Sequence, residues 1–494
     1  MDSTRDTSTD RGTDSGIDTG SGSGAEDAGP AAAGGQGLGL DVAAYRAAVD
    51  QEFDAVIREL SELVAIPGIA WDSFDAAQLH RSAEAVAALL EAEGFETVEI
   101  LPADGQAAHP GVVAHLPGEQ GRPTVLLYAH HDVQPPGDPG AWTTPPFEAV
   151  QRDGRLWGRG AADDKAGVMA HIAAVRALRR VRGDGHGLGI TVFIEGEEEA
   201  GSPNFARFLA AHRERLAADA IVIADSANWQ VGVPTLTTSL RGVVGAVVEV
   251  RGLDHTLHSG GYGGPVLDGP TLLSRLIASL HDDDGAVAIE GLHHQDAPGD
   301  LDYDEQQFRA DAGVLPGVEL AGRGSLTSRL WTQPAISVTG FDATAVEVAS
   351  NTLAPSARAK ISLRIAPGED PHEAARLLTR HLEAHVPFGA HLSVEIEETG
   401  PAFATDTTAP AAQDMLWALG ASWGRPSVEM GMGGSIPFTA DLQAAYPEAA
   451  ILVTGIEDPD TRAHGIDESL HLGDYRRAIL AEALWLAARA GSER

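Results

Sequence analysis

The chain has 494 residues, more than one hydrophobic core usually organises, so we expect two domains. It contains no cysteine, which excludes disulfides and thiolate metal sites and leaves His, Asp and Glu as the side chains that would bind a metal. Its formal net charge of −38 at pH 7 argues against nucleic acid as a partner, because phosphates would be repelled.

Residues 1–40 are a low-complexity segment in which Asp recurs at every fourth position among Ser, Thr and Gly. Large apolar residues are almost missing there, so we expect a disordered tail without a catalytic role. The beginning of the chain lacks the charged and then apolar pattern of an export signal. No apolar run approaches the ~20 residues of a membrane span. We therefore expect a cytoplasmic protein that does not contact a membrane.

Residues 41–239 predict an α/β region, because amphipathic helical patterns alternate with apolar strand patterns. The run 124–129 is apolar throughout, which is typical of a central strand buried on both faces. In chain order we predict helices at 41–65 and 77–94, strands at 97–101, 111–116 and 124–129, a helix at 164–182, and strands at 189–194 and 220–224.

The pattern changes near residue 240 and returns near residue 404. In between we predict a strand at 243–250, a helix at 268–281, an irregular acidic stretch at 282–330, a strand at 359–365, a helix at 371–385 and a strand at 391–397. We interpret 240–403 as a smaller α/β domain inserted into the first one. A helix at 409–421, a strand at 449–453 and a helix at 473–490 complete the first domain, 41–239 and 404–494. The expected fold class is α/β, with a mixed central sheet flanked by helices.

Side chains suited to metal binding gather where the predicted strands end. The segment 130–132 (His-His-Asp) follows one strand, 197–199 (Glu-Glu-Glu) follows another, and Asp225 follows a third. The segment 160–165 (Gly-Ala-Ala-Asp-Asp-Lys) begins a helix, and 462–465 (Arg-Ala-His-Gly) lies beyond the inserted domain. One His-x-Asp pair is more often a surface turn, and three Glu are more often a solvated helix start. Their recurrence after buried strands, where charge is costly, instead indicates a site for divalent cations.

Together these motifs resemble metallopeptidase family 20 of clan MH, which contains aminoacylases, glutamate carboxypeptidases and carnosinases. The elements His-x-Asp-Val, Gly-Arg-Gly-Ala-x-Asp-x-Lys and Glu-Glu-x-Gly-Ser occur in order, and the resemblance covers about residues 45–490. The stretches 254–264 (Asp-His-Thr-Leu-His-Ser-Gly-Gly-Tyr-Gly-Gly) and 432–437 (Met-Gly-Gly-Ser-Ile-Pro) are similar to the carnosinase-like dipeptidase branch. The resemblance implies that the inserted domain serves as a lid and in dimerisation.

The resemblance also implies two divalent metal ions, with Zn²⁺ expected and Mn²⁺ or Co²⁺ as alternatives. One ion would be bound by His130 and Asp225, the other by Glu199 and His464. Asp163 matches the family's bridging position and would bind both ions. In this family the peptide bond that follows the bridging Asp is often cis, so we expect a cis bond after Asp163.

Catalytic roles follow from the same resemblance. Glu198 would be the general base, and Asp132 would orient His130 without binding metal. Glu197 would be a spacer. His258 would reach the active site of the neighbouring subunit and stabilise the oxyanion, which requires a homodimer. The carboxylate of the substrate would be bound by Arg364, Thr352 and Ser435.

These assignments predict a metal-dependent hydrolase that cleaves the peptide bond of dipeptides or short peptides, with a metal-bridged water as the nucleophile. An N-acyl amino acid deacylase or desuccinylase with the same ligands is the alternative within the family. A non-catalytic metal- or peptide-binding protein is disfavoured, because only catalysis requires Glu198. His131 is expected to point away from the site along a strand. The other histidines without a ligand context are expected in helix faces or loops: His171, His293, His294, His381, His385 and His391.

Overall fold

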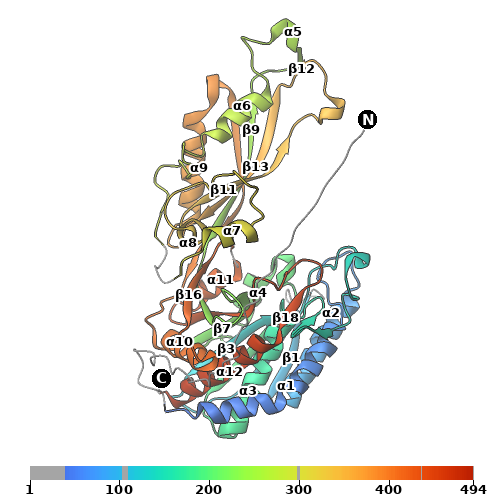
Figure 1. Cartoon of the computed structure of the whole chain (residues 1–494), viewed down its shortest axis with the longest axis vertical. Helices are drawn as coiled ribbons and strands as arrows, with labels where there is room; N and C mark the ends of the chain where they lie inside the picture. Colours follow the sequence, from blue (N-terminus) through green and yellow to red (C-terminus); the bar gives the residue numbers. More distant parts are fainter. Residues whose placement is uncertain (1–38, 103–108, 297–300, 435–436, 493–494) are drawn as a thin grey trace, which may run out of the picture. The chain divides into compact units, whose positions relative to one another are not determined.

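The computed structural model describes residues 39–102, 109–296, 301–434 and 437–492 (Figure 1). The expected tail at 1–40 and the candidate residue Ser435 fall outside these ranges, apart from the last two residues of the tail. Within the described ranges, no helix combines the length and the apolar character that crossing a bilayer requires.

The helices predicted from periodicity are present, with ends set by side chains that cap them. The carboxylates of Asp41, Asp75, Asp268 and Asp370 each accept a hydrogen bond from a backbone N–H in the first turn of the helix that follows. These helices are α1 (Val42–Val64), α2 (Ala76–Ala92), α3 (Lys165–Arg182), α6 (Gly269–Ala278), α9 (Pro371–His385), α10 (Pro410–Trp423) and α12 (Leu472–Gly491).

The central sheet is mixed, which confirms the predicted fold class. Its strands lie in the order β1-β2-β6-β3-β7-β17-β8-β15, with β16 paired to β8. The strands β6, β3, β7 and β17 are parallel, whereas β1, β2, β8 and β15 add antiparallel pairs. Their bounds are β1 (Thr97–Pro102), β2 (Pro110–Leu116), β3 (Thr124–His130), β6 (Gly189–Glu195), β7 (Ala220–Ala227), β8 (Thr235–Leu240), β15 (Phe403–Ala404), β16 (Val428–Met432) and β17 (Ala450–Glu457).

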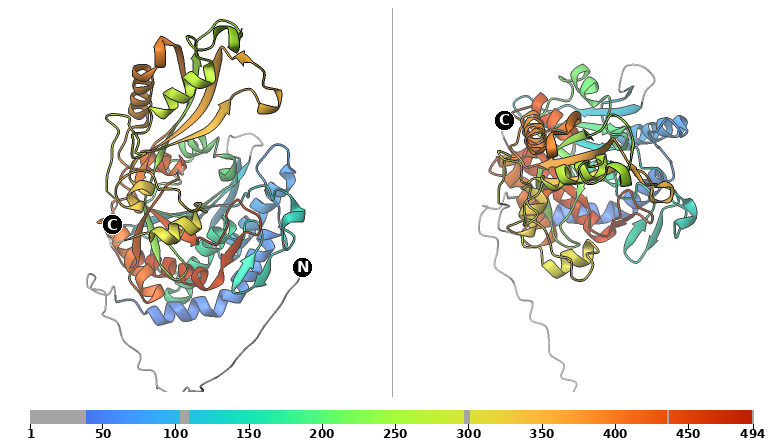
Figure 2. Two further views of the ribbon diagram at one scale, coloured as in Figure 1. Left: turned by 45° about the horizontal axis from the view of Figure 1, so that its top comes forward. Right: turned by 90° about the horizontal axis from the view of Figure 1, so that it is seen from above.

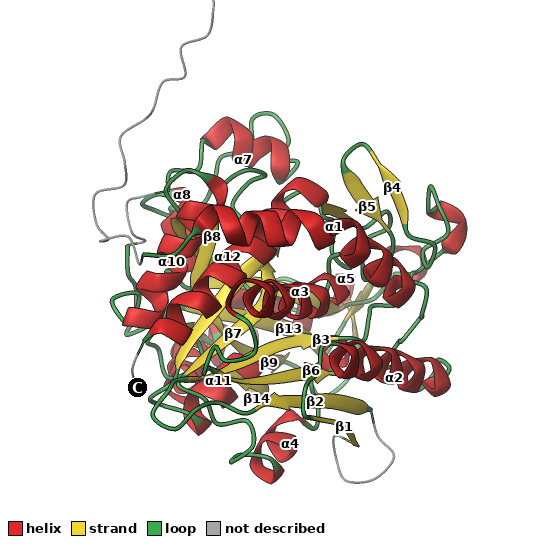
Figure 3. Ribbon diagram, turned by 90° about the horizontal axis from the view of Figure 1, so that it is seen from below, coloured by secondary structure: helices red, strands yellow, loops and turns green. Residues whose placement is uncertain are grey.

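The two faces of this sheet pack on different hydrophobic cores. On β3, Val125 and Leu127 belong to the core shared with α1, α3 and α12. Leu126 and Tyr128 belong to the core shared with α4 (Phe205–Ala211) and α11 (Pro437–Ala445). Figure 3 shows α1, α3 and α12 side by side over one face of the sheet. The apolar run of β3 is therefore explained by burial on both faces.

A second sheet is antiparallel, in the order β11-β13-β9-β14. Its helices α6 and α9 cover one face (Figure 2). The strands are β9 (Gly242–Arg251), β11 (Ala335–Asp342), β13 (Ser356–Ile365) and β14 (His391–Gly400). A separate two-stranded sheet pairs β10 (Leu257–His258) with β12 (Thr352–Leu353), next to α5 (Ser259–Tyr262).

The chain passes between the central and the second sheet twice. β8 ends at Leu240 and β9 begins at Gly242, while β14 ends at Gly400 and β15 begins at Phe403. A Cβ atom on Gly242 would come within 2.5 Å of the carbonyl oxygen of Gly400, so the close approach of the two crossings requires glycine. The domain boundaries at 240 and 403 stay a prediction, which these strand ends support.

The stretch 282–330 is not irregular throughout, so this expectation was wrong in part. It contains α7 (Glu305–Asp311) and α8 (Leu326–Trp331), capped by Asp304 and Ser325. Helices of six or seven residues are too short to show a clear apolar period. The same reason explains why the three-stranded sheet of β4 (Val150–Arg152), β5 (Arg155–Trp157) and β18 (Ser469–His471) was not predicted.

Candidate metal centre

Adjacent parallel strands bring the candidate ligands to one edge of the central sheet. His130 is the last residue of β3, Asp225 lies near the end of β7, and Glu199 lies in the turn that follows β6. The strands β6, β3 and β7 are neighbours in the sheet, so their carboxyl ends lie together. Asp163 directly precedes the capping residue of α3, and His464 lies in the loop after β17.

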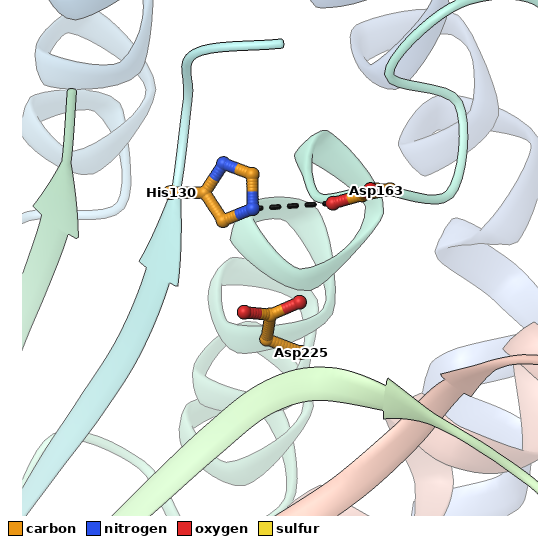
Figure 4. Close-up of side chains that lie close together, drawn as sticks. All are labelled: His130, Asp163 and Asp225. Atoms are coloured by element: carbon orange, nitrogen blue, oxygen red, sulfur yellow. Dashed lines mark ion pairs between the residues drawn. The ribbon is translucent and has the colours of Figure 1, made fainter. Parts of the chain in front are cut away.

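Two groups of three potential ligands share one carboxylate. Ligand atoms of His130, Asp163 and Asp225 all lie within 4.8 Å of one another (Figure 4), and so do those of Asp163, Glu199 and His464. Asp163 Oδ1 is 3.2 Å from His130 Nε2, and Asp163 Oδ2 is 3.1 Å from His464 Nε2. His464 Nε2 is also 3.1 Å from Glu199 Oε2. The two oxygens of Asp163 therefore face different histidines, as in a carboxylate that bridges two ions.

The donor atoms fit divalent cations. His130 Nε2 is buried and makes no hydrogen bond among the described residues, although carboxylate oxygens surround it. Two imidazoles and three carboxylates form a nitrogen and oxygen donor set that suits Zn²⁺ and the related divalent ions. His464 has a left-handed backbone with φ 63°, which a residue other than glycine adopts only where its surroundings hold it.

Asp132 connects the end of β3 with the turn that carries the glutamates. Its Oδ1 atom lies 3.3 Å from His130 Nδ1, on the side of the imidazole opposite Asp163. The same carboxylate accepts hydrogen bonds from the backbone N–H groups of Glu198 at 3.2 Å and Glu199 at 3.1 Å. Asp132 is thus in position to orient one potential ligand and to fix the backbone of another.

The backbone around Asp163 is held by residues that sequence reasoning had not identified. The peptide bond between Asp163 and Asp164 is cis, as predicted. Asp164 accepts a hydrogen bond from the backbone N–H of His130 at 3.1 Å and caps α3. The buried Glu468 accepts from the N–H groups of Ala162 at 3.0 Å and Asp163 at 3.1 Å. These two carboxylates fix the position of the shared ligand.

Glu197, expected to be a spacer between the functional glutamates, belongs to neither group of candidate ligands, but its side chain has a structural role that the sequence had not indicated. Its side chain is buried and accepts hydrogen bonds from the backbone and side-chain N–H groups of Asn204 at 2.8 and 3.1 Å. It also lies 3.1 Å from His109 Nδ1. These contacts fasten the turn that contains Glu198 and Glu199.

Gln134 is a further contact of the candidate ligand Glu199 that the sequence had not indicated. Its backbone N–H donates to Glu199 Oε1 at 3.0 Å, and its side-chain amide donates to Glu199 Oε2 at 2.7 Å. Both oxygens of this carboxylate are thereby oriented from the loop that follows β3.

Electrostatics at the centre indicate a deficit of positive charge. Burial raises the pKa of Asp225 to about 7. Burial, together with the charge of Asp225, raises the pKa of Glu198 well above its usual value, although His130 opposes the rise. Hydrogen bonds to Asp163 and Glu199 raise the pKa of His464 to about 11. Bound cations would relieve the repulsion among these carboxylates.

The candidate residues of the inserted region lie on its strands. His258 is exposed and pairs with Thr352 across the β10–β12 sheet. Its Nδ1 atom accepts a hydrogen bond from the backbone N–H of Gly260 at 3.1 Å. Among the described residues, neither His258 nor Thr352 forms a hydrogen bond or ion pair with a candidate ligand. Arg364 is half-buried on β13.

Two of the other histidines are core residues with backbone or carboxylate partners. His131 Nε2 lies 2.7 Å from the carbonyl oxygen of Pro110. The imidazole of His171 bridges Glu482 Oε1 and the carbonyl oxygen of Tyr128, at 2.8 Å each. Both histidines connect elements of the core and belong to neither group of candidate ligands.

We expect metal binding to stabilise the protein more at pH 8 than at pH 6. In the metal-free protein, Asp225 has a pKa raised to about 7 and His464 one raised to about 11, so the stability that each contributes in its protonated form falls as pH rises. Bound cations reverse this trend because they favour deprotonated ligands. At pH 8, saturating Zn²⁺ should raise the Tm of chelator-treated protein by roughly 4 °C. Calorimetry at both pH values measures the effect, and an equal gain at pH 6 would contradict it.

Comparison with known proteins shows that this chain is similar to metal-dependent peptidases. A family model described as Peptidase family M20/M25/M40 matches residues 126–487. The chain is 38% identical over 368 residues to a cysteinylglycine-S-conjugate dipeptidase of Corynebacterium striatum. The aligned region covers 74% of this chain and 80% of that protein. It is 31% identical over 309 residues to a β-Ala-His dipeptidase of Mus musculus, and the aligned region covers 59% of this chain and 62% of that protein.

The fold is also similar to that of a solved structure. The dipeptidase Dug1p of Saccharomyces cerevisiae superposes with a TM-score of 0.73 at 22% identity. The match covers 92% of this chain and 99% of that chain. It therefore includes both the central sheet with its helices and the smaller antiparallel sheet.

Proposed function

Because the chain belongs to peptidase family M20 and is a metallodipeptidase of its carnosinase-like branch, we propose that it hydrolyses Cys-Gly and related dipeptides. The observation that carries the proposal is the position of Asp163 between two groups of potential ligands. The substrate class is taken from the relative that is 38% identical, whose name specifies conjugates of cysteinylglycine.

We propose that the five candidate ligands hold two Zn²⁺ ions, with Mn²⁺ or Co²⁺ as alternatives. His130 and Asp225 would bind one ion, Glu199 and His464 the other, and Asp163 both. When bound, such ions lower the pKa of a water molecule and polarise the scissile carbonyl group.

Glu198 is the proposed general base. It is not a member of either ligand group, and its Oε2 atom lies 3.9 Å from His130 Nε2, so it borders the centre without binding in it. In this role Glu198 takes a proton from the attacking water and delivers it to the leaving amine. Its raised pKa, caused first by burial, favours holding that proton between the two steps. Asp132 would keep His130 and the backbone of Glu198 in place during the reaction.

Substrate binding is assigned to the inserted region. We propose that Arg364 and Thr352, with Ser435, bind the carboxylate of the dipeptide. His258 would stabilise the oxyanion in the active site of a partner subunit, so the enzyme would be a homodimer. His258 and Thr352 are both exposed and lie opposite each other on β10 and β12, which suits two residues that contact the same substrate. The cytoplasm stays the predicted compartment.

A substrate panel tests the proposed function. The protein, loaded separately with Zn²⁺, Mn²⁺ and Co²⁺, should hydrolyse Cys-Gly, S-benzyl-Cys-Gly and β-Ala-His. We expect kcat/KM for the best dipeptide to exceed that for N-acetyl and N-succinyl amino acids by about 100-fold or more, because a site built for the free carboxylate and amine discriminates strongly. Faster hydrolysis of the N-acyl substrates would instead identify a deacylase with the same ligands.

A further inference from the structure

Arg241 is a buried arginine at the first crossing between the central and the second sheet. Only 8% of the residue is exposed to solvent. Nε donates to the carbonyl oxygen of Gly433 at 3.1 Å, and Nη1 donates to the carbonyl oxygens of Arg329 at 3.4 Å and Gln333 at 3.3 Å. Nη2 has no acceptor among the described residues, and none of their carboxylates forms an ion pair with Arg241.

Within the part of the chain that the structure describes, no carboxylate pairs with the positive charge of Arg241. Burial lowers the pKa of Arg241 to about 10, and the nearby charge of Arg364 adds to the effect. The guanidinium group still carries its proton at neutral pH. Carbonyl groups satisfy part of its hydrogen-bonding capacity but do not neutralise it, and a buried charge without a counter-charge is unfavourable. An anionic ligand would complete the site.

Arg241 directly precedes β9, and Arg364 lies on the neighbouring strand β13. Val243 of β9 is directly opposite Arg364 of β13, and Gly242 is opposite Ile365. Arg241 precedes Val243 by two residues, so a pleat that continued from β9 to Arg241 would place its side chain on the side of Val243 and Arg364. Diagonal neighbours of this kind have Cα atoms roughly 7–8 Å apart, a separation that long side chains span. The charge of Arg364 lowers the pKa of Arg241, which agrees with two guanidinium groups close enough to bind one carboxylate.

Arg241 is also connected to the candidate metal centre. Gly433, whose carbonyl oxygen accepts from Arg241, follows Met432 in the chain. The sulfur atom of Met432 accepts a hydrogen bond from Ser226 Oγ at 3.1 Å, and Ser226 follows the candidate ligand Asp225. Gly433 and Met432 thus connect the guanidinium group of Arg241 to β7, the strand that contains Asp225.

We propose that Arg241 binds the free C-terminal carboxylate of the dipeptide together with Arg364 and thereby makes the enzyme selective for substrates with a free C-terminus. The inference rests on the proposed dipeptidase function. Nε and Nη1 already donate to carbonyl oxygens, so the N–H groups of Nη2 are the donors that remain for a carboxylate oxygen. The charge of the substrate would offset the repulsion between the two arginines.

The test compares a dipeptide with its C-terminal amide. Wild-type protein, Arg241→Met, Arg241→Lys and the control Arg358→Met are assayed with S-benzyl-Cys-Gly and S-benzyl-Cys-Gly amide. Arg358 lies on the same strand and face as Arg364 but is exposed. Arg241→Met should lower kcat/KM for the free acid by about 10- to 100-fold and change that for the amide by less than about 2-fold. Arg241→Lys, which keeps the charge but loses the planar group and part of its carbonyl contacts, should be intermediate, and the control should resemble the wild type.

Parallel losses with acid and amide would overturn the proposal, because they would show that Arg241 only supports the loop at Gly433 and the end of α8. Unchanged selectivity in both variants would overturn it as well. Arg241→Lys provides the answer if Arg241→Met does not fold, as judged by its circular dichroism spectrum. The two proposals fail separately: the wild-type rate with the free dipeptide tests the dipeptidase function, and the ratio of acid to amide rates tests Arg241.

Discussion

Replacing Glu198 with Gln is expected to lower kcat for dipeptide hydrolysis by about 10²- to 10⁴-fold while both metal ions stay bound. Gln has nearly the shape of Glu but cannot accept a proton from water at neutral pH. Glu198 is absent from both groups of candidate ligands, so metal affinity should be preserved. Its backbone contact with Asp132 is unchanged by the substitution, so the turn should keep its position.

The measurement combines initial rates with elemental analysis of the same samples. Glu84→Gln is the matched control, because Glu84 is exposed on α2 and outside the centre. The control should retain wild-type kcat and metal content. If Glu198→Gln kept more than about a tenth of the wild-type rate, the assignment of the base would be wrong. If it lost its metal as well, Glu198 would be a ligand instead.

The elements that build the centre were predictable because their patterns are local. Burial on both faces makes β3 a continuous apolar run, and the capping carboxylates mark the starts of α1 and α2 in the sequence. Where such strands end, charged side chains are conspicuous. These side chains predicted where a cation site would lie, and the resemblance to a known family then implied His130 and Asp225 as ligands and Asp163 as the bridging residue.

The residues that hold these side chains were not predictable, because their partners are distant in sequence. Glu468 accepts a hydrogen bond from the backbone of Asp163, 305 residues earlier. Glu197 looked like any glutamate in a solvated turn, and only the folded chain reveals that it binds Asn204 and contacts His109. Strand order is another long-range property, which a list of strands leaves open. Arg241 illustrates the same limit, since its three carbonyl partners come from separate segments.

Mixing two inactive variants is expected to restore about a quarter of the wild-type activity if His258 acts in the partner's site. Glu198→Gln removes the proposed base, and His258→Ala removes the proposed oxyanion donor, which should cost about 10²- to 10³-fold in kcat. In a mixed dimer, one active site combines the intact base of the His258→Ala subunit with His258 of the other subunit. Random exchange makes about half of the dimers mixed, and each of these has one working site of two.

The experiment distinguishes action in trans from action within one chain. Subunits are exchanged by dilution and reconcentration, and the activity is followed as the ratio of the two variants changes. It should pass through a maximum at equal amounts, because mixed dimers are then most frequent. His255→Ala is the control: His255 is exposed beside the same loop and should leave the activity of the dimer unchanged. Activity that stays at the level of the separate variants would mean that His258 serves its own chain or is not catalytic. The exposure of His258, without a bond to any candidate ligand among the described residues of its own chain, favours the maximum.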